Sequence, residues 1–260
     1  MYPRKGNIVS YKLSRISYYL IKNGIPFCGS RNYSKFIILS RSRTGSNFLL
    51  SLLNSHPNID CYGELFLHLR GKDSLEIWKR IFKKHPGRIK CVGFKLFYYH
   101  PVDSDDKKVW NLIEGDPQIK IIHLKRKNLL RTILSRKIAE KTKIWKENST
   151  KTFIPPKEKA VKLSHVECLN EFNKIRAWEN EADARFSKHA IFEIYYEDLV
   201  HQRDVVMNDV YSFLNLKKHQ PYTDLRKQNK EGFQDLILNY NSLKVSFTGT
   251  GWESMFEEDE

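Results

Sequence analysis

The sequence predicts a three-layer α/β fold in which helices cover both faces of a central parallel sheet. Short apolar runs, typical of buried strands, alternate with amphipathic helical segments of a dozen residues or more. Strands separated by such helices pair in parallel through right-handed crossovers. No repeat or low-complexity linker divides the chain, and its 260 residues, 40% of them hydrophobic, suffice for one large core. We therefore expect a single domain over residues 35–260, preceded by a basic N-terminal arm over residues 1–34.

Strands and helices are predicted in alternation along this domain. Nearly continuous apolar residues indicate strands that are buried on both faces, and such runs occupy residues 35–40, 90–97, 120–124 and 190–195. A short second strand is expected at residues 59–61. Apolar residues at spacings of three and four indicate helices, and these cover residues 45–55, 73–84, 128–145 and 164–186. Asp73 with Glu76 resembles a capping box, and Ser164 with Glu167 is a second helix start signal. Residues 146–163, which include two adjacent prolines, are predicted to form a loop.

The stretch between the first strand and the first helix has the composition of an anion-binding turn. A strand that runs directly into a helix points backbone N–H groups and the positive helix end at one spot, which suits a phosphate or sulfate. Gly45 permits a tight approach, Thr44 and Ser46 add hydroxyl donors, and Arg43 adds charge. The alternative is an ordinary turn with Ser and Thr caps, and no lysine precedes Ser46 as a Walker A loop requires. The predicted anion site comprises Arg41, Ser42, Arg43, Thr44, Gly45, Ser46 and Asn47.

Four motifs follow one another in a fixed order between residues 35 and 252. They are RSRTGSNFL with HPNIDCYGELF, then IIHLKRKNLLRTILSRKIA, then IYYEDLV with VVMNDVYSFLNL, and finally DLILNYNSLKVSFTGTGW. In this order they resemble sulfotransferases that use 3′-phosphoadenosine 5′-phosphosulfate (PAPS), in particular the bacterial carbohydrate sulfotransferases of the nodulation-factor and trehalose type. The resemblance implies a P-loop-like sheet and transfer of a sulfuryl group from PAPS to a hydroxyl of a carbohydrate or glycolipid, with release of PAP.

The resemblance also implies roles for individual residues. The first turn would bind the 5′-phosphosulfate. Arg126 and Ser135 match the segment that binds the 3′-phosphate, with Lys125 as the neighbouring alternative to Arg126. Tyr196 matches a tyrosine that lies near the adenine. Glu64 matches the glutamate that is the proposed base in bacterial members.

Sulfuryl transfer is an in-line displacement, so its catalysis rests on positioning and charge stabilisation. Arg43 is suited to stabilise charge on the leaving group, and because its pKa exceeds 12 it acts as a charge and not as a proton donor. Lys95, at a strand end, is either that proton donor or a solvated lysine. Glu64 is either the base or a surface glutamate. His100 is the reserve base, whereas His123, inside a strand, is expected to be a packed histidine.

The net charge of +15 favours anionic partners but does not choose among them. A nucleic-acid-binding module is the second hypothesis, although the basic residues are interleaved with acidic ones and no RNP, KH or zinc-finger pattern occurs. A small-molecule kinase is the third. We expect no specific nucleic acid, no metal, and peripheral contact with an anionic membrane surface. No apolar run reaches about 18 residues and no signal peptide pattern is present, so we expect a cytoplasmic protein.

Overall fold

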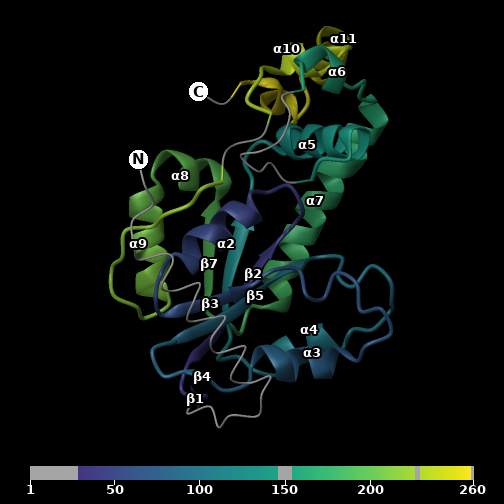
Figure 1. Cartoon of the computed structure of the whole chain (residues 1–260). Coiled ribbons are helices and arrows are strands. Elements are labelled where there is room, and N and C mark those ends of the chain that lie inside the picture. Colours follow the sequence, from purple (N-terminus) through teal and green to yellow (C-terminus); the bar gives the residue numbers. More distant parts are fainter. Residues whose placement is uncertain (1–28, 146–153, 226–228, 259–260) are drawn as a thin grey trace.

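A five-stranded parallel sheet forms the centre of the protein (Figure 1). The computed structural model describes residues 29–145, 154–225 and 229–258. The strands of this sheet, in chain order, are β2 (Ser34–Ser40), β3 (Ile59–Tyr62), β5 (Cys91–Phe97), β6 (Lys120–Lys125) and β7 (Ile191–Tyr195). Every strand predicted from the sequence is confirmed, and its bounds shift by one residue at most.

The strand order places β2 where the chain changes direction across the sheet. The order is β3-β5-β2-β6-β7, and neighbouring strands are parallel throughout. From β2 the chain first fills one side of the sheet with β3 and β5, and then the other side with β6 and β7. Because the connections leave in opposite directions, a crevice forms at the carboxyl end of β2, which is where open α/β sheets bind ligands.

Helices cover both faces of the sheet, as Figure 1 shows. Side chains of β2 alternate between the two faces: Phe36 and Ile38 belong to one apolar cluster, Ile37 and Leu39 to the other. The first cluster is covered by α2 (Ser46–Asn54), α8 (Tyr196–His201) and α9 (Arg203–Phe213). The second is covered by α3 (Ser74–Ile81), α4 (Lys108–Glu114) and the end of α7 (His165–Arg185). The predicted three-layer fold is therefore confirmed.

The helix after β3 begins as predicted but ends early. Asp73 caps α3 by accepting the N–H of Leu75 at 3.1 Å. The helix ends at Ile81, three residues before the predicted bound at 84. The chain turns there into β4 (His85–Pro86), which pairs antiparallel with β1 (Gly29–Ser30), and a proline cannot continue a helix interior.

A helical unit lies at the carboxyl end of the sheet, and the sequence did not predict it in full. A third apolar cluster joins α5 (Leu129–Thr142) and the start of α7 to the C-terminal segments. These segments are α10 (Phe233–Leu236), α11 (Tyr240–Phe247) and η1 (Glu253–Phe256), and α6 (Pro156–Lys159) contacts α5 and α10. The predicted loop over 146–163 is wrong in its second part, because α6 forms there and Val161 bridges to Ile237. In Figure 1, α6, α10 and α11 lie beyond α5, on the side away from the sheet.

The predicted N-terminal arm lies mostly outside the described residues, which begin at residue 29. Residues 29–34 belong to the folded part, because β1 pairs with β4 and Ser34 opens β2. The single domain over 35–260 stays a prediction. In the part of the chain that the structure describes, no helix has both the length and the apolar character needed to cross a membrane.

Candidate functional site

A cavity of about 1840 Å³ opens at the carboxyl end of β2. Small-molecule sites have volumes of roughly 300–1,000 Å³, so this cavity has room for a nucleotide and a second substrate. Its lining includes most of the predicted site residues: Arg41, Ser42, Arg43, Gly45, Ser46, Asn47, Glu64, Arg126, Ser135 and Tyr196. Thr44 and Lys95 are buried next to them. The fold thus gathers residues from β2 to the start of α8 at one place.

The turn between β2 and α2 has an unusual backbone that explains its glycine. Gly45 has a φ of 89°, and Arg43 has a φ of 68°. The ring of Tyr196, at the start of α8, packs directly on Gly45, so a Cβ built there would lie 2.1 Å from the Tyr196 Cδ2. Only glycine combines this close approach with a left-handed backbone at low cost.

Arg43 joins the turn to α5. Its guanidinium donates to the Ser135 hydroxyl through Nε at 2.9 Å and through Nη2 at 2.7 Å. Arg126, directly after β6, donates to the backbone oxygen of Arg43 at 3.1 Å and stacks 4.7 Å from the Tyr196 ring centroid. Burial lowers the pKa of Arg43, and the charge of Arg126 lowers it further. Two guanidinium groups brought together in this way favour an anion between them.

Arg41 has a different environment from Arg43. It is buried and forms an ion pair with Glu171 of α7. Glu171 also pairs with Arg136 of α5 at 3.3 Å. Burial lowers the pKa of Arg41, while the Glu171 charge raises it. Glu171, on α7, therefore joins the turn to α5 and α7. This ion pair could not be predicted from the sequence, because 130 residues separate Arg41 from Glu171.

Glu64 and Lys95 form an ion pair beside the turn. The Lys95 Nζ lies 2.7 Å from the Glu64 Oε1 and donates to the Asn47 Oδ1 at 2.6 Å. Lys95 is 1% exposed, whereas the Glu64 side chain is 28% exposed and lines the cavity. The alternative interpretation of Lys95 as a solvated strand-end lysine is therefore wrong. The pair places a carboxylate at the cavity surface with a buried cation behind it.

His100 is separated from the cavity surface. It is fully buried, and its Nδ1 accepts the N–H of Phe97 at 3.3 Å. Burial lowers its pKa to about 3, and the charge of Lys95 contributes in the same direction. A histidine with so low a pKa is a weak base at neutral pH.

The low pKa of His100 predicts a pH-dependent stability. In the unfolded chain a histidine takes up its proton near pH 6.5, and the folded pKa is about 3. Between these values the unfolded state binds more protons, so the free energy of unfolding falls as the pH falls. The titration of His100 alone should lower the free energy of unfolding by about 2 kcal/mol between pH 8 and pH 5. In urea unfolding experiments, the free energy of unfolding of His100→Gln should fall less steeply with falling pH than that of the wild type. The same pH dependence in His100→Gln as in the wild type would contradict a neutral His100. His201→Gln, which replaces an exposed histidine, is the matched control.

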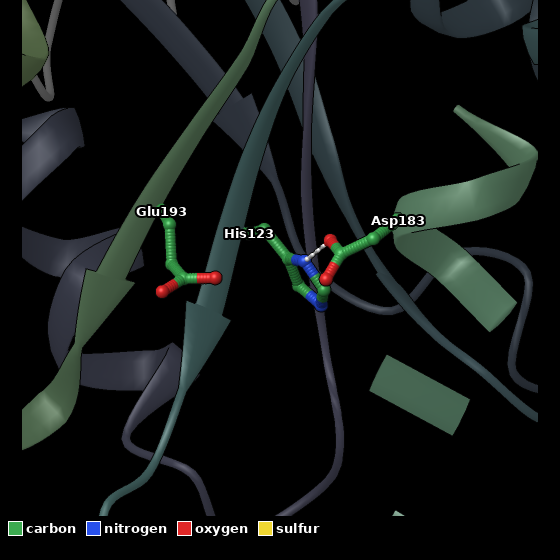
Figure 2. A group of neighbouring side chains, drawn as sticks. All are labelled: His123, Asp183 and Glu193. Atoms are coloured by element: carbon green, nitrogen blue, oxygen red, sulfur yellow. Dashed lines mark hydrogen bonds and ion pairs between the residues drawn. The ribbon is translucent and has the colours of Figure 1, made fainter. Parts of the chain in front are cut away.

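His123 is buried and belongs to a charged group with Asp183 and Glu193, whose carboxylates are partly exposed, as shown in Figure 2. Its Nδ1 is 2.8 Å from the Asp183 Oδ1 of α7, and burial lowers its pKa to about 4. His123, Asp183 and Glu193 have the spacing of metal ligands, but Lys125 pairs with both carboxylates. An ammonium of the protein itself therefore already pairs with both carboxylates. His123 is packed, as predicted, and Lys125 faces this group while Arg126 lines the cavity.

Three cavity or support residues were missed by the sequence interpretation. Tyr99 and Trp178 line the cavity, and Glu197 accepts the N–H of Lys127 at 3.0 Å and that of Asn128 at 3.3 Å. Glu197 thereby fixes α8 against the start of α5. Both Glu197 and Tyr99 could have been found from the sequence, because Glu197 belongs to the YEDL motif and Tyr99 follows a predicted strand. Trp178 had none, because one aromatic residue in a long helix is typical of a core.

Comparisons with known proteins agree with the four motifs. No protein-family model matches the chain. The chain is 28% identical over 244 residues to nodulation protein H of Rhizobium tropici, covering 86% of this chain and 94% of the relative. It is 26% identical over 241 residues to nodulation protein H of Rhizobium meliloti (strain 1021), covering 85% and 94%. A solved sulfotransferase from Alicyclobacillus acidocaldarius is similar with a TM-score of 0.46 and 15% identity, covering 86% of this chain and 96% of that one.

The similarity to nodulation protein H extends over nearly the whole of each relative. The predicted resemblance to bacterial sulfotransferases of the nodulation-factor type is therefore confirmed, and the chain is similar to nodulation protein H over most of its length.

Proposed function

We propose that the protein transfers a sulfuryl group from PAPS to a hydroxyl of a carbohydrate or glycolipid and releases PAP. The observation that carries this proposal is the contact between the two predicted anion sites. Arg43, from the turn predicted to hold the 5′-phosphosulfate, donates twice to Ser135, and Arg126 donates to the Arg43 backbone. A nucleotide with phosphates at both its 5′ and 3′ positions needs two such sites within its own length.

The residues of the turn and of α5 hold the donor in this proposal. The N–H groups of the turn and of the start of α2 donate to the phosphosulfate at the 5′ end, where the helix dipole favours negative charge. Arg126 and Ser135 hold the 3′-phosphate, because a guanidinium fork with a hydroxyl matches its oxygens. Tyr196 borders the same space between Gly45 and Arg126 and provides a flat face for the adenine side. No metal has a role in this scheme.

Glu64 removes the proton from the acceptor. A new bond forms between the acceptor oxygen and sulfur, the bond between sulfur and the phosphate oxygen breaks, and the bonding pair leaves with PAP. The hydroxyl proton goes to the Glu64 carboxylate. Arg43 stabilises the charge that grows on the leaving phosphate, and Lys95 holds Glu64 and Asn47 in place through its two short contacts.

Incubation with ³⁵S-labelled PAPS and a panel of sugars, glycolipids and simple alcohols tests this proposal. We expect a labelled sulfate ester and an equal amount of PAP. A wild-type protein that labels none of these hydroxyl compounds would contradict the proposal. Phosphorylation from ATP would favour the kinase hypothesis, and binding of DNA or RNA with a steep salt dependence would favour the nucleic-acid module. The cytoplasmic location and the membrane contact stay predictions from the sequence.

A further inference from the structure

A short basic segment between α3 and β5 has no role in the proposed transfer. The chain has no Asp or Glu between Glu76 and Asp103. Its cations at the end of α3 and along the path through β4 to β5 are Lys79, Arg80, Lys83, Lys84, Arg88 and Lys90. Lys83 is half-buried, and the other five are exposed. We call these six residues the basic surface.

Carboxylates of the protein do not compensate the charge of the basic surface. None of the six side chains forms an ion pair with any residue that the structure describes. Basic residues at and before α5 differ, since Lys127 pairs with Asp198 and Lys137 pairs with Glu167. Like charges on neighbouring residues repel one another, and an anionic partner that contacts all six would relieve this repulsion.

The end of α3 explains only two of the six charges. Lys79 and Arg80 lie in the last turn of the helix, where cations interact favourably with the negative end of the helix dipole. The other four follow the helix, and its dipole does not reach beyond the last turn. A solvated basic face is the ordinary interpretation of such a run, so a binding role needs further support from the structure.

Backbone contacts hold the basic surface in place. The Tyr33 hydroxyl donates to the Lys83 carbonyl oxygen at 2.8 Å, and β4 pairs with β1. Beyond β4, the Asn58 side chain donates to the Arg88 carbonyl oxygen at 2.6 Å, and the Lys90 N–H donates to the Asn58 carbonyl oxygen at 2.8 Å. In Figure 1, α3 and β4 lie at the opposite end of the molecule from α6, α10 and α11. The cations are therefore displayed together at one end of the protein.

The large cavity connects the basic surface with the predicted transfer site. Lys83, Lys84 and Arg88 line the same cavity as Glu64. The proposed acceptors include glycolipids, whose acyl chains stay in a bilayer while the sugar part enters an enzyme. A bilayer that contacts the basic surface would face the part of the cavity that these three cations line.

We infer that the basic surface docks the protein on a bilayer that contains anionic phospholipids. Clusters of roughly four to eight Lys and Arg residues bind such lipids. A single-stranded nucleic acid fits less well, because its bases need exposed aromatic faces. The rings within the segment, Trp78 and Phe82, pack against the apolar core. The choice of a bilayer as partner rests on the proposed function, whereas the uncompensated charge does not.

Three lysines of the basic surface provide the test. Lys79→Gln, Lys84→Gln and Lys90→Gln are combined in one variant, and each replaces an exposed side chain. Binding is measured by sedimentation with vesicles of phosphatidylcholine and phosphatidylglycerol in a ratio of about 7:3, in about 0.1 M NaCl. The variant should bind roughly 10²-fold more weakly than the wild type, because each cation at an anionic surface contributes about a fivefold factor. Binding of the wild type should weaken as the NaCl concentration rises.

A second triple variant separates the basic surface from the net charge. Lys162→Gln, Lys188→Gln and Lys244→Gln remove three exposed lysines outside the basic surface and change the net charge by the same amount. This control should bind the vesicles within about twofold of the wild type, because distant charges are screened at this salt concentration. Equal weakening in the two triple variants would overturn the inference, because binding would then follow net charge alone.

Two other results would also overturn the inference. One is a wild-type protein that does not bind the anionic vesicles. The other is a basic-surface variant that binds the vesicles like the wild type but loses affinity for an RNA or DNA oligonucleotide. Stabilisation by PAP should be the same in the wild type and in both triple variants, because neither changes a predicted donor-site residue. Its absence from the wild type would contradict the proposed function and leave the vesicle result standing, so the two failures are distinguishable.

Discussion

Glu64→Gln should lower the turnover of the protein by roughly 10²–10⁴-fold and leave PAP affinity nearly unchanged. Glutamine keeps the size of the side chain, and its amide oxygen can still accept from the Lys95 Nζ, which lies 2.7 Å from the Glu64 Oε1. It cannot take the proton of the acceptor hydroxyl. Turnover with saturating ³⁵S-labelled PAPS, measured beside a PAP titration, separates the two effects.

A second carboxylate of the cavity provides the control for Glu64. Asp60 lies on β3 and lines the cavity, but it pairs with His85 at 3.0 Å and accepts from the Tyr62 hydroxyl. Asp60→Asn should keep turnover close to that of the wild type. Full activity in Glu64→Gln would contradict its role as base. Loss of PAP binding in that variant would show that the carboxylate holds Lys95 and the turn in place.

Gly45→Ala should weaken PAP binding by roughly 10²-fold or more, because the turn must shift to admit the methyl group. The added Cβ would meet the Tyr196 ring at 2.1 Å, and the backbone at φ 89° would be strained as well. The left-handed backbone alone costs about 1–2 kcal/mol in a residue with a Cβ. Isothermal titration with PAP, together with urea unfolding, measures binding and stability separately.

Two other glycines isolate the causes of that loss. Gly71 has a φ of 75° with open space around it, so Gly71→Ala should lose some stability and keep PAP affinity. Gly63, which precedes Glu64, has neither a positive φ nor a close neighbour. Gly63→Ala should therefore bind PAP like the wild type. Normal PAP affinity in Gly45→Ala would contradict the assignment of the turn as the 5′ site.

The strands and the turn could be predicted because their signals are local. The run KFIILS is fully apolar at its centre, and the turn between β2 and α2 has its glycine and cations within seven residues. The order of the strands then places this turn at the crevice of the sheet. Local chemistry and a general rule of α/β topology were therefore sufficient to locate the site.

The partners of the site residues could not be predicted, because they come from distant parts of the chain. Arg43 contacts Ser135 across 92 residues of sequence, and Arg41 contacts Glu171 across 130. Lys95 is charged, so the sequence suggested exposure as readily as burial. Its burial depends on Glu64 and Asn47, which reach it from a loop and a helix.

The C-terminal helical unit shows a second reason why prediction fails. Segments α6 and α10 have four residues each, too few for a helical period to be visible. The α10 side chains Phe233 and Leu236 pack in the third apolar cluster with α5 and α7, and α6 lies against α5 and α10, contacts that only the folded chain makes. Trp178 is similar, since its position on α7 becomes informative only when Tyr99 and the cavity lie beside it.

The central claim is that one nucleotide occupies both the turn at Arg43 and the site at Arg126 and Ser135. Thermal unfolding with PAP or with ATP at equal concentration tests it most directly, because ATP lacks the 3′-phosphate. PAP at 100 times its Kd should add about 2.7 kcal/mol of stability. This corresponds to a Tm rise of roughly 5–10 °C for a chain of this size. ATP should add much less, and Arg126→Ala should reduce the PAP shift to that of ATP. Equal shifts with PAP and ATP in the wild type would contradict the account.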